Sequence, residues 1–142
     1  MPRSIKMVTN KIIYFDINII IDLLDDTRIN NGNAKRLIRQ LTLENFQIVM
    51  SEDMLTTIFD IVKDKKSVLE FFNSIQNKWI LAPFGKELIQ DAIKLSMKMN
   101  LDLEDVLQCL CAKKNACEVL ITNDKKFHDC GMKIVGYDYF EI

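Results

Sequence analysis

The hydrophobic residues of the chain fall into short unbroken runs, separated by longer stretches in which they recur every three or four positions. Unbroken apolar runs bounded by polar residues are typical of buried parallel strands, and the wider spacing is typical of amphipathic helices. The runs predict strands at residues 11–15, 46–50, 79–82 and 118–122, with 133–135 as a candidate edge strand. The spaced stretches predict helices at residues 18–24, 34–43, 52–62, 67–75, 86–99 and 102–114.

Small polar residues at the starts of these helices are the expected N-caps. They are Asn33, Ser51, Ser67 and Asp102. Residues 1–10 are polar and predict a short lead-in, residues 30–33 a loop, and residues 124–127 one helical turn at most. Strands that alternate with helices or helix pairs favour a mostly parallel sheet with helices on both faces and right-handed crossovers. The pattern therefore predicts an α/β fold.

Composition limits the domain organisation and the class of protein. The length of 142 residues is typical of one domain, and four Gly and two Pro leave little room for a linker. We therefore expect a single domain over residues 1–142. The net charge of −1 excludes a broadly basic nucleic-acid-binding protein, although a local basic patch beside an acidic site is compatible with it.

The four cysteines do not favour a zinc site, because they contain no CxxC pair and the chain has a single histidine, His128. Cys109 and Cys111 follow a helical apolar pattern, in which a free cysteine packs as a small core residue. The first residues lack the apolar core of a secretory signal, and no run of about 18 apolar residues could cross a membrane. We therefore expect a protein of the reducing cytoplasm without membrane contact.

Acidic residues occur where predicted elements meet one edge of the sheet. Asp16 directly follows the first strand, and Asp124 lies two residues beyond the fourth. Asp102, Glu104 and Asp105 open the helix before the fourth strand. If the first and fourth strands are neighbours, Asp16 and Asp124 share the carboxyl edge, where open α/β sheets bind ligands.

Clustered carboxylates resist joint ionisation unless a cation neutralises them. Mg²⁺ prefers oxygen ligands, keeps several waters, and commonly uses one or two carboxylates together with a substrate phosphate. Such an ion activates water and stabilises the charge that develops in phosphodiester cleavage. The chain offers no rival chemistry, since it has no glycine-rich phosphate loop and no GxSxG motif.

Structural roles explain each of these residues taken singly. Asp16 could cap the following helix, and Asp124 could cap a turn. Acids at a helix N-terminus also interact favourably with the helix dipole. His128 is expected on the surface or in a turn, and Lys125 and Lys126 could be a solvated charge pair. The coincidence of three acidic positions under one topology favours the functional interpretation.

Two motifs carry a family resemblance that covers nearly the whole chain. A strand followed by Asp-x-Asn and a further Asp four residues on occurs at Asp16, Asn18 and Asp22. Residues 101–124, LDLEDVLQCLCAKKNACEVLITND, form the second motif. In this order and spacing, the two motifs resemble those of the PIN-domain ribonucleases, most closely the branch related to VapC-type toxins.

Within the second motif, the resemblance identifies individual residues. Asp105 matches the aspartate of the family's helix, and Thr122 and Asp124 match the threonine and last aspartate of a T-x-D-x-x-F pattern that Phe127 completes. The resemblance implies a three-layer α/β/α sandwich with a five-stranded parallel sheet. It also implies a nuclease site for Mg²⁺ or Mn²⁺ at Asp16, Asp105 and Asp124. Many members form homodimers and are inhibited by a small antitoxin protein.

One position departs from the family pattern. The resemblance implies a glutamate on the helix after the second strand, about six residues beyond Ser51, and this chain has Thr57 there. The Thr57 hydroxyl could hold a water at the metal but supplies no charge. Asp53 and Asp60 lie about one turn to either side, and Glu104, beside Asp105, is the better candidate to restore the charge.

The resulting prediction is a metal-dependent endoribonuclease, the toxin of a toxin–antitoxin pair. Asn18 and Thr122 are expected to orient ligands or water by hydrogen bonds. The residues expected to contact the RNA backbone are Lys35, Arg36, Arg39, Lys125 and Lys126. The alternative is a catalytically weakened or inactive PIN-like module that binds RNA or a protein partner, and Thr57 is its motivation.

Overall fold

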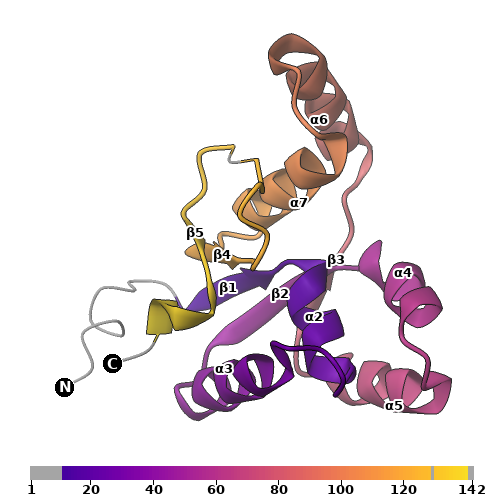
Figure 1. Ribbon diagram of the computed structural model, residues 1–142. Helices are drawn as coiled ribbons and strands as arrows, with labels where there is room; N and C mark the ends of the chain where they lie inside the picture. The colour runs from indigo at the N-terminus through magenta and orange to yellow at the C-terminus, as the bar shows by residue number, and fades with distance from the viewer. Residues whose placement is uncertain (1–10, 129, 141–142) are drawn as a thin grey trace.

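The structure, a computed structural model, describes residues 11–128 and 130–140, so the predicted lead-in at residues 1–10 lies outside the described residues. A five-stranded sheet forms its centre (Figure 1). The strands are β1 (Ile12–Phe15), β2 (Gln47–Ser51), β3 (Ile80–Ala82), β4 (Val119–Ile121) and β5 (Ile134–Val135). Their order is β3-β2-β1-β4-β5, and every neighbouring pair is parallel. The predicted α/β class and the edge position of the last strand are therefore confirmed.

Helices cover both faces of this sheet. They are α2 (Ile17–Leu24), α3 (Asn31–Leu43), α4 (Met54–Ile61), α5 (Lys65–Ile75), α6 (Lys86–Met99) and α7 (Leu103–Lys114), followed by the 3₁₀ helix η1 (Tyr137–Phe140). The first two crossovers step from β1 to β2 to β3 in one direction, and the third steps back past β1 to β4. Right-handed connections then require α6 and α7 to lie on the face opposite α2 and α3, as Figure 1 shows.

The strand order reverses between β1 and β4. Tyr14 of β1 pairs with Val49 on one side and with Leu120 on the other, and Phe15 pairs with Ile121. Crossovers leave β1 and enter β4 on different faces, so a crevice opens at the carboxyl ends of these two strands. The predicted neighbourhood of the first and fourth strands is thus confirmed.

The central strands are buried because their residues are apolar on both faces. Ile13, Tyr14 and Phe15 have no exposed surface, and neither do Leu120 and Ile121. The helices α6 and α7 have the predicted bounds, and Asp102 caps α7 by accepting a hydrogen bond from the backbone N of Asp105 at 3.0 Å. No helix in residues 11–128 and 130–140 combines the length and apolarity needed to cross a bilayer.

Three predicted N-caps are wrong. Helix α3 begins before Asn33, which therefore lies inside the helix. Ser51 is the last residue of β2, and α4 begins only three residues later, so Ser51 is not its N-cap. Ser67 lies within α5, whose N-cap is Asp64; the Asp64 side chain accepts a hydrogen bond from the Ser67 backbone N at 3.1 Å.

Cys109 does not pack as the free thiol that we expected. It forms a disulfide with Cys130, which lies in the loop after β4, and the two Cα atoms are 6.0 Å apart. Cys111 is a free, buried cysteine, as expected. The bridge attaches the loop between β4 and β5 to the middle of α7.

Candidate active site

Asp16 occupies the carboxyl end of β1 and is 6% exposed. One carboxylate oxygen, Oδ1, accepts a hydrogen bond from the backbone N of Ile17 at 2.9 Å, so Asp16 does cap α2. The other oxygen, Oδ2, accepts a hydrogen bond from Thr122 Oγ1 at 2.7 Å. Both neutral donors leave the negative charge of Asp16 without a positive partner among these contacts.

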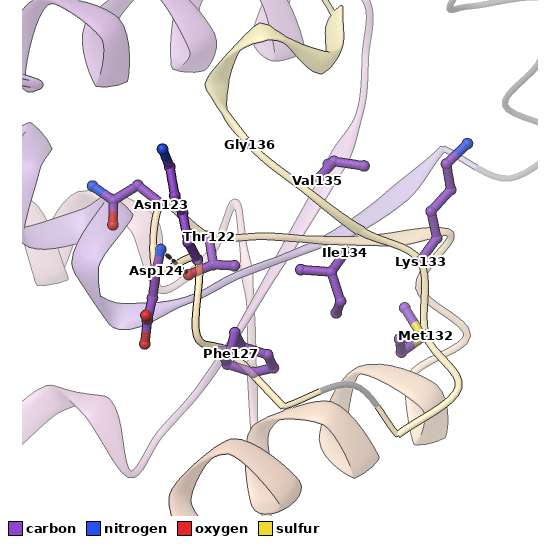
Figure 2. A pocket seen from close by; sticks show the side chains of 10 residues that line it. Thr122, Asn123, Asp124, Phe127, Met132, Lys133, Ile134, Val135 and Gly136 are labelled. Atoms are coloured by element: carbon purple, nitrogen blue, oxygen red, sulfur yellow. Dashed lines mark hydrogen bonds between the residues drawn. The ribbon is translucent and has the colours of Figure 1, made fainter.

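Thr122 links Asp16 to Asp124. Its Oγ1 accepts a hydrogen bond from the Asp124 backbone N at 3.0 Å, which Figure 2 marks with a dashed line. The Asp124 side chain is exposed and accepts a hydrogen bond from the Lys126 backbone N at 2.9 Å. Asp124 therefore does cap a turn, as the structural alternative proposed, and this turn begins directly beside Asp16.

Asp105 has a partner that sequence reasoning missed. Its Oδ2 accepts a hydrogen bond from the backbone N of His128 at 3.1 Å and lies 3.2 Å from the ring atom Nδ1 of the same residue. Asp105 extends from the first turn of α7, and His128 comes from the loop after β4. The sequence places His128 four residues beyond Asp124, but this position does not indicate that Asp105 is its partner.

The ionisation of Asp16 depends on its burial, its hydrogen bonds and the charges of two other acids. Burial raises the pKa of the Asp16 carboxyl, the hydrogen bonds from Thr122 and Ile17 lower it, and the charges of Asp105 and Asp124 raise it. Two carboxylates from distant parts of the chain, Asp105 and Asp124, therefore disfavour the ionised form of Asp16 at the carboxyl end of β1.

The pKa of the Asp105 carboxyl is also raised, first by burial and then by the nearby charge of Asp102, whereas His128 lowers it. Burial raises the pKa of Glu104, its hydrogen bond with Gln108 lowers it, and the charges of Asp53, Asp102 and Asp16 raise it. Glu104 is thus close enough to both Asp53 and Asp16 to be repelled by them.

Sequence comparison decides the family. The model of the PIN domain matches residues 13–126, most of the chain. The chain belongs to the PIN-domain family. Within it, the chain is 33% identical over 132 residues to ribonuclease VapC1 of Aquifex aeolicus (strain VF5), which covers 90% of this chain and 92% of that protein. The resemblance to the VapC-like branch is thereby confirmed.

Solved structures of PIN-domain toxins share the fold. VapC20 of Mycobacterium tuberculosis, described as a sarcin–ricin loop cleaving toxin, aligns with a TM-score of 0.68 at 13% identity, over 84% of this chain and 95% of that chain. VapBC2 of Rickettsia felis, solved with a DNA fragment from its promoter, aligns with a TM-score of 0.67 at 15% identity, over 88% and 98%. These similarities confirm the α/β/α sandwich architecture.

Asp22, the second aspartate of the opening PIN-domain motif, is held by contacts within the fold. Asp22 is 2% exposed and receives three side-chain hydrogen bonds. The donors are Arg28 Nε at 2.7 Å, Asn123 Nδ2 at 2.9 Å and the Tyr137 hydroxyl at 2.6 Å. This group joins α2, the end of β4 and η1, and its charge is balanced by Arg28.

Asn18 and Thr57, two further positions of the PIN-domain pattern, make fewer side-chain contacts than Asp22. Asn18 is half-buried in the first turn of α2, and Thr57 is exposed on α4. In the described part of the chain, neither side chain has a hydrogen-bond partner. Asp53, the residue before α4, contributes to raising the pKa of Glu104 by its charge.

The basic residues fall into two groups. Lys125 and Lys126 are exposed and directly follow Asp124. Lys35, Arg36 and Arg39 are exposed on α3, where the two arginines line a separate cavity with Gln40, Leu43 and Glu44. Helix α3 lies on the face of the sheet opposite α7 (Figure 1).

The donor chemistry of the site fits a hard divalent cation. Asp16, Glu104, Asp105 and Asp124 offer only carboxylate oxygens, which are the ligands that Mg²⁺ and Mn²⁺ prefer. Across residues 11–128 and 130–140, no three Asp, Glu, His or Cys side chains converge into a ready-made metal cage. Mg²⁺ requires no such cage, since it commonly takes one or two carboxylates and completes its shell with water and phosphate.

A cavity of about 600 Å³ adjoins Asp124. Thr122, Asp124 and Lys125 line one side of it, and Phe127 and Ile134 contribute apolar surface. Figure 2 shows Phe127 and Ile134 between the segment after β4 and β5, with Asp124 at one end. The volume is in the range of pockets that hold small organic groups.

Proposed function

We propose that this protein is a metal-dependent endoribonuclease, with Asp16, Asp105 and Asp124 at its active site and Glu104 assisting. The observation that carries the proposal is the position of Asp16 where the strand order reverses, joined through the Thr122 hydroxyl to the Asp124 backbone, with the charges of Asp105 and Asp124 raising its pKa. A buried carboxylate such as Asp16 is unfavourable when the charges that act on it are also negative, and a site that binds a cation explains its presence.

Mg²⁺ or Mn²⁺ is the proposed cofactor, and its carboxylate ligands would come from Asp16, Asp105 and Asp124. When bound, such an ion neutralises the acids and supplies the Lewis acidity that phosphodiester hydrolysis requires. The carboxylate oxygens of these three acids support this choice over zinc.

The remaining residues of the site would orient these ligands. Thr122 donates to Asp16 and accepts from the Asp124 backbone, so one hydroxyl fixes both acids. His128 holds Asp105 by its backbone N–H. Asn18, in the first turn of α2, is proposed to hold water or substrate by its amide. Thr57 would contribute at most a hydroxyl.

RNA is the proposed substrate, and both the relatives and the cavity support it. One relative is named a ribonuclease, and one structural neighbour is described as cleaving the sarcin–ricin loop. Lys125 lines the cavity and Lys126 follows it, so both are suited to contact the backbone next to Asp124. The Phe127 ring offers a surface on which an unpaired base could stack. Lys35, Arg36 and Arg39 remain candidates for a more distant part of the RNA.

An antitoxin protein and a second copy of the chain are the proposed partners, in a cytoplasmic setting. A toxin–antitoxin complex from Klebsiella pneumoniae shares the fold, with a TM-score of 0.65 at 19% identity over 87% of this chain. Helix α6 leaves Ile89, Ile93 and Met97 exposed, and apolar side chains in this spacing form a surface that a protein partner would cover. Light scattering of the purified chain measures whether it dimerises.

The decisive experiment measures RNA cleavage by the purified chain with Mn²⁺. The variant Asp16→Asn/Asp105→Asn should lose activity while its unfolding transition remains cooperative. Asp91→Asn, an exposed acid on α6, is the matched control and should retain activity. Cleavage that survives in the double variant would overturn this assignment of the site.

A second candidate function is a PIN-domain module that binds RNA or protein without cleaving RNA. Thr57 in place of a glutamate favours it, together with the lack of a ready-made metal cage in the described residues. Calorimetry with Mn²⁺ separates the two functions. Mn²⁺ binding that is lost in Asp124→Ala supports the nuclease, and RNA binding without any Mn²⁺ binding supports the module.

A further inference from the structure

A chain of two hydrogen bonds runs from the buried centre of the sheet to Glu104, an exposed residue of α7. The Tyr14 hydroxyl on β1 donates to Gln108 Oε1 on α7. Gln108 Nε2 in turn donates to Glu104 Oε1 at 3.1 Å, one helical turn earlier. Tyr14 is 0% exposed and Gln108 is 2% exposed. The buried side-chain amide of Gln108 therefore contacts both the Tyr14 hydroxyl and the Glu104 carboxylate.

A glutamine is a costly choice for this place in α7. Its buried neighbours on the helix are Val106, Cys109, Cys111 and Ala112, all small or apolar. A buried amide is unfavourable unless both of its polar atoms are hydrogen-bonded, and an apolar residue would fill the same space at lower cost. Both polar atoms of Gln108 are used, one by Tyr14 and one by Glu104.

The direction of the amide follows from its two partners. Glu104 is a carboxylate and accepts hydrogen bonds, so the NH₂ group of Gln108 must face it. The Gln108 oxygen then faces Tyr14, whose hydroxyl donates. Burial raises the pKa of the Tyr14 hydroxyl, which therefore keeps its proton and remains a donor. The chain thus has one consistent arrangement of donors and acceptors.

Glu104 lies in the first turn of α7, next to Asp105. The nearby charges that act on its carboxylate are those of Asp53, Asp102 and Asp16. Asp53 opens α4, the helix on which the family resemblance implied a glutamate and this chain has Thr57. The geometry agrees, because Gln108 contacts Tyr14, two residues before Asp16 on β1, and Glu104 lies one turn before Gln108 at the N-terminal end of α7.

We propose that Gln108, oriented by Tyr14, is a positioning residue that holds Glu104 toward Asp16, so that Glu104 replaces the glutamate absent from α4. This inference rests on the proposed function, because the ligand that Glu104 would serve is the divalent cation. Gln108 touches neither the cation nor the RNA in this proposal and acts through Glu104 alone.

The test measures the Mn²⁺ dissociation constant of the full chain by calorimetry, without substrate. Glu104→Gln and Gln108→Met should each weaken Mn²⁺ binding by about tenfold or more, as is typical when a residue that orients a metal ligand is removed. The double variant should bind no more weakly than Glu104→Gln alone, because the two residues act through one carboxylate. Tyr14→Phe should weaken binding by a smaller factor.

The control is Gln40→Met. Gln40 is a half-buried glutamine on α3 whose Nε2 donates to the carbonyl oxygen of Phe140 at 2.6 Å. This variant should lower the denaturation midpoint and leave the Mn²⁺ dissociation constant unchanged. If Gln108→Met fails to fold, the pair Tyr14→Phe/Gln108→Met removes both polar partners, leaves no orphaned hydroxyl and still lacks the donor to Glu104.

Three outcomes would overturn the inference. The first is a Gln108→Met protein that loses stability as Gln40→Met does but binds Mn²⁺ as the wild type does. The second is a double variant whose losses of affinity simply add. The third is a wild-type chain that binds no Mn²⁺, which would overturn the proposed function as well. Mn²⁺ binding that depends on Asp16 but not on Glu104 or Gln108 would leave the proposed function intact and reject only the positioning role.

Discussion

Two aspartates six positions apart, Asp16 and Asp22, are both almost fully buried, yet their surroundings are opposite. Asp22 receives three side-chain hydrogen bonds, and one donor is the guanidinium of Arg28 at 2.7 Å. Asp16 receives two hydrogen bonds from neutral donors, and the charges nearest to it belong to Asp105 and Asp124. The charge of Asp22 is neutralised within the fold, and the charge of Asp16 is not.

The difference separates a structural acid from a functional one in the same strand–helix segment. A buried charge whose partner is part of the protein stabilises the fold, or at least costs little. A buried charge among like charges destabilises the fold, and its retention is best explained by a ligand that compensates it. Sequence position alone does not distinguish the two, because both aspartates belong to the same PIN-domain motif.

The largest expected effect concerns the function of Asp16. Asp16→Asn should weaken Mn²⁺ binding and lower the rate of RNA cleavage by about 10³-fold, since a catalytic metal contributes several kcal/mol. The free energy of unfolding of the metal-free protein should change by less than about 1 kcal/mol, because removing a repelled charge offsets the lost hydrogen bond. Calorimetry, a cleavage assay and urea denaturation measure these quantities. A large loss of stability with unchanged Mn²⁺ affinity would reverse the roles assigned to the two aspartates.

The next effect concerns the stability provided by Asp22. Asp22→Asn should lower the free energy of unfolding by about 2–4 kcal/mol, because Arg28 loses its ionic partner and a donor is left facing the new amide. Mn²⁺ affinity should fall much less than in Asp16→Asn. Asp26→Asn, an exposed acid in the following turn, is the control and should change stability little. Equal stability of the Asp22 and Asp26 variants would contradict the structural role.

A smaller effect is a pH dependence of the metal-free protein. The pKa values of Asp16 and Asp105 are raised by folding, so the folded state binds protons more tightly than the unfolded state. Their destabilising contribution is present at neutral pH and is relieved as the pH falls through the folded pKa values. Lowering the pH from neutral toward about 4, the ordinary pKa of an aspartate, should therefore stabilise the metal-free protein.

Mn²⁺ provides the control for this pH effect, because the ion binds the ionised carboxylates and favours the higher pH. Thermal denaturation scans with and without Mn²⁺ should therefore show opposite trends between these pH values. Asp25 and Asp64 have lowered pKa values and act in the other direction, but only at more acidic pH. A metal-free protein that loses stability throughout this range would contradict the repulsion between Asp16 and its neighbours.

The smallest effect concerns Thr57. Thr57→Glu adds a carboxylate one turn beyond Asp53 and should tighten Mn²⁺ binding by only a few-fold, about 1 kcal/mol or less, because Glu104 already supplies charge there. Thr56→Glu adds the same charge at the neighbouring exposed position and should not change Mn²⁺ affinity. If Thr57→Glu raised the affinity by several orders of magnitude, Glu104 could not be the replacement that we infer.

The fold could be predicted wherever apolar pattern and local stop signals agreed. Helices α6 and α7 were predicted with their observed bounds, because Asp102 is a strong cap and Pro83 ends the preceding strand. The caps at Ser51 and Ser67 were wrong, because Ser, Asp and Asn compete for the same role and local sequence does not decide between neighbours. Pairing with a neighbouring strand extends β2 to Ser51. Asp64, and not Ser67, is the N-cap of α5.

The candidate site could be predicted in part. Asp16 and Asp124 each follow a strand, so they lie close together whenever these two strands are neighbours in the sheet. The alternation of strands and helices along the chain limits the possible strand orders. The contacts of Asp105 with His128 and of Tyr14 with Gln108 could not be predicted, because they join positions 23 and 94 residues apart. Such contacts depend on the path of a loop and on the packing of α7 against the sheet, and neither leaves a periodic signal.

The bridge between Cys109 and Cys130 has a practical consequence for anyone who purifies this protein. The segment that it closes carries Thr122, Asp124 and His128, all of which contact the acids of the site or each other. A thiol reagent in the buffer reduces the disulfide and detaches the loop between β4 and β5 from α7. Preparations made with and without dithiothreitol are therefore two covalent species, and each needs its own melting curve and its own cleavage rate.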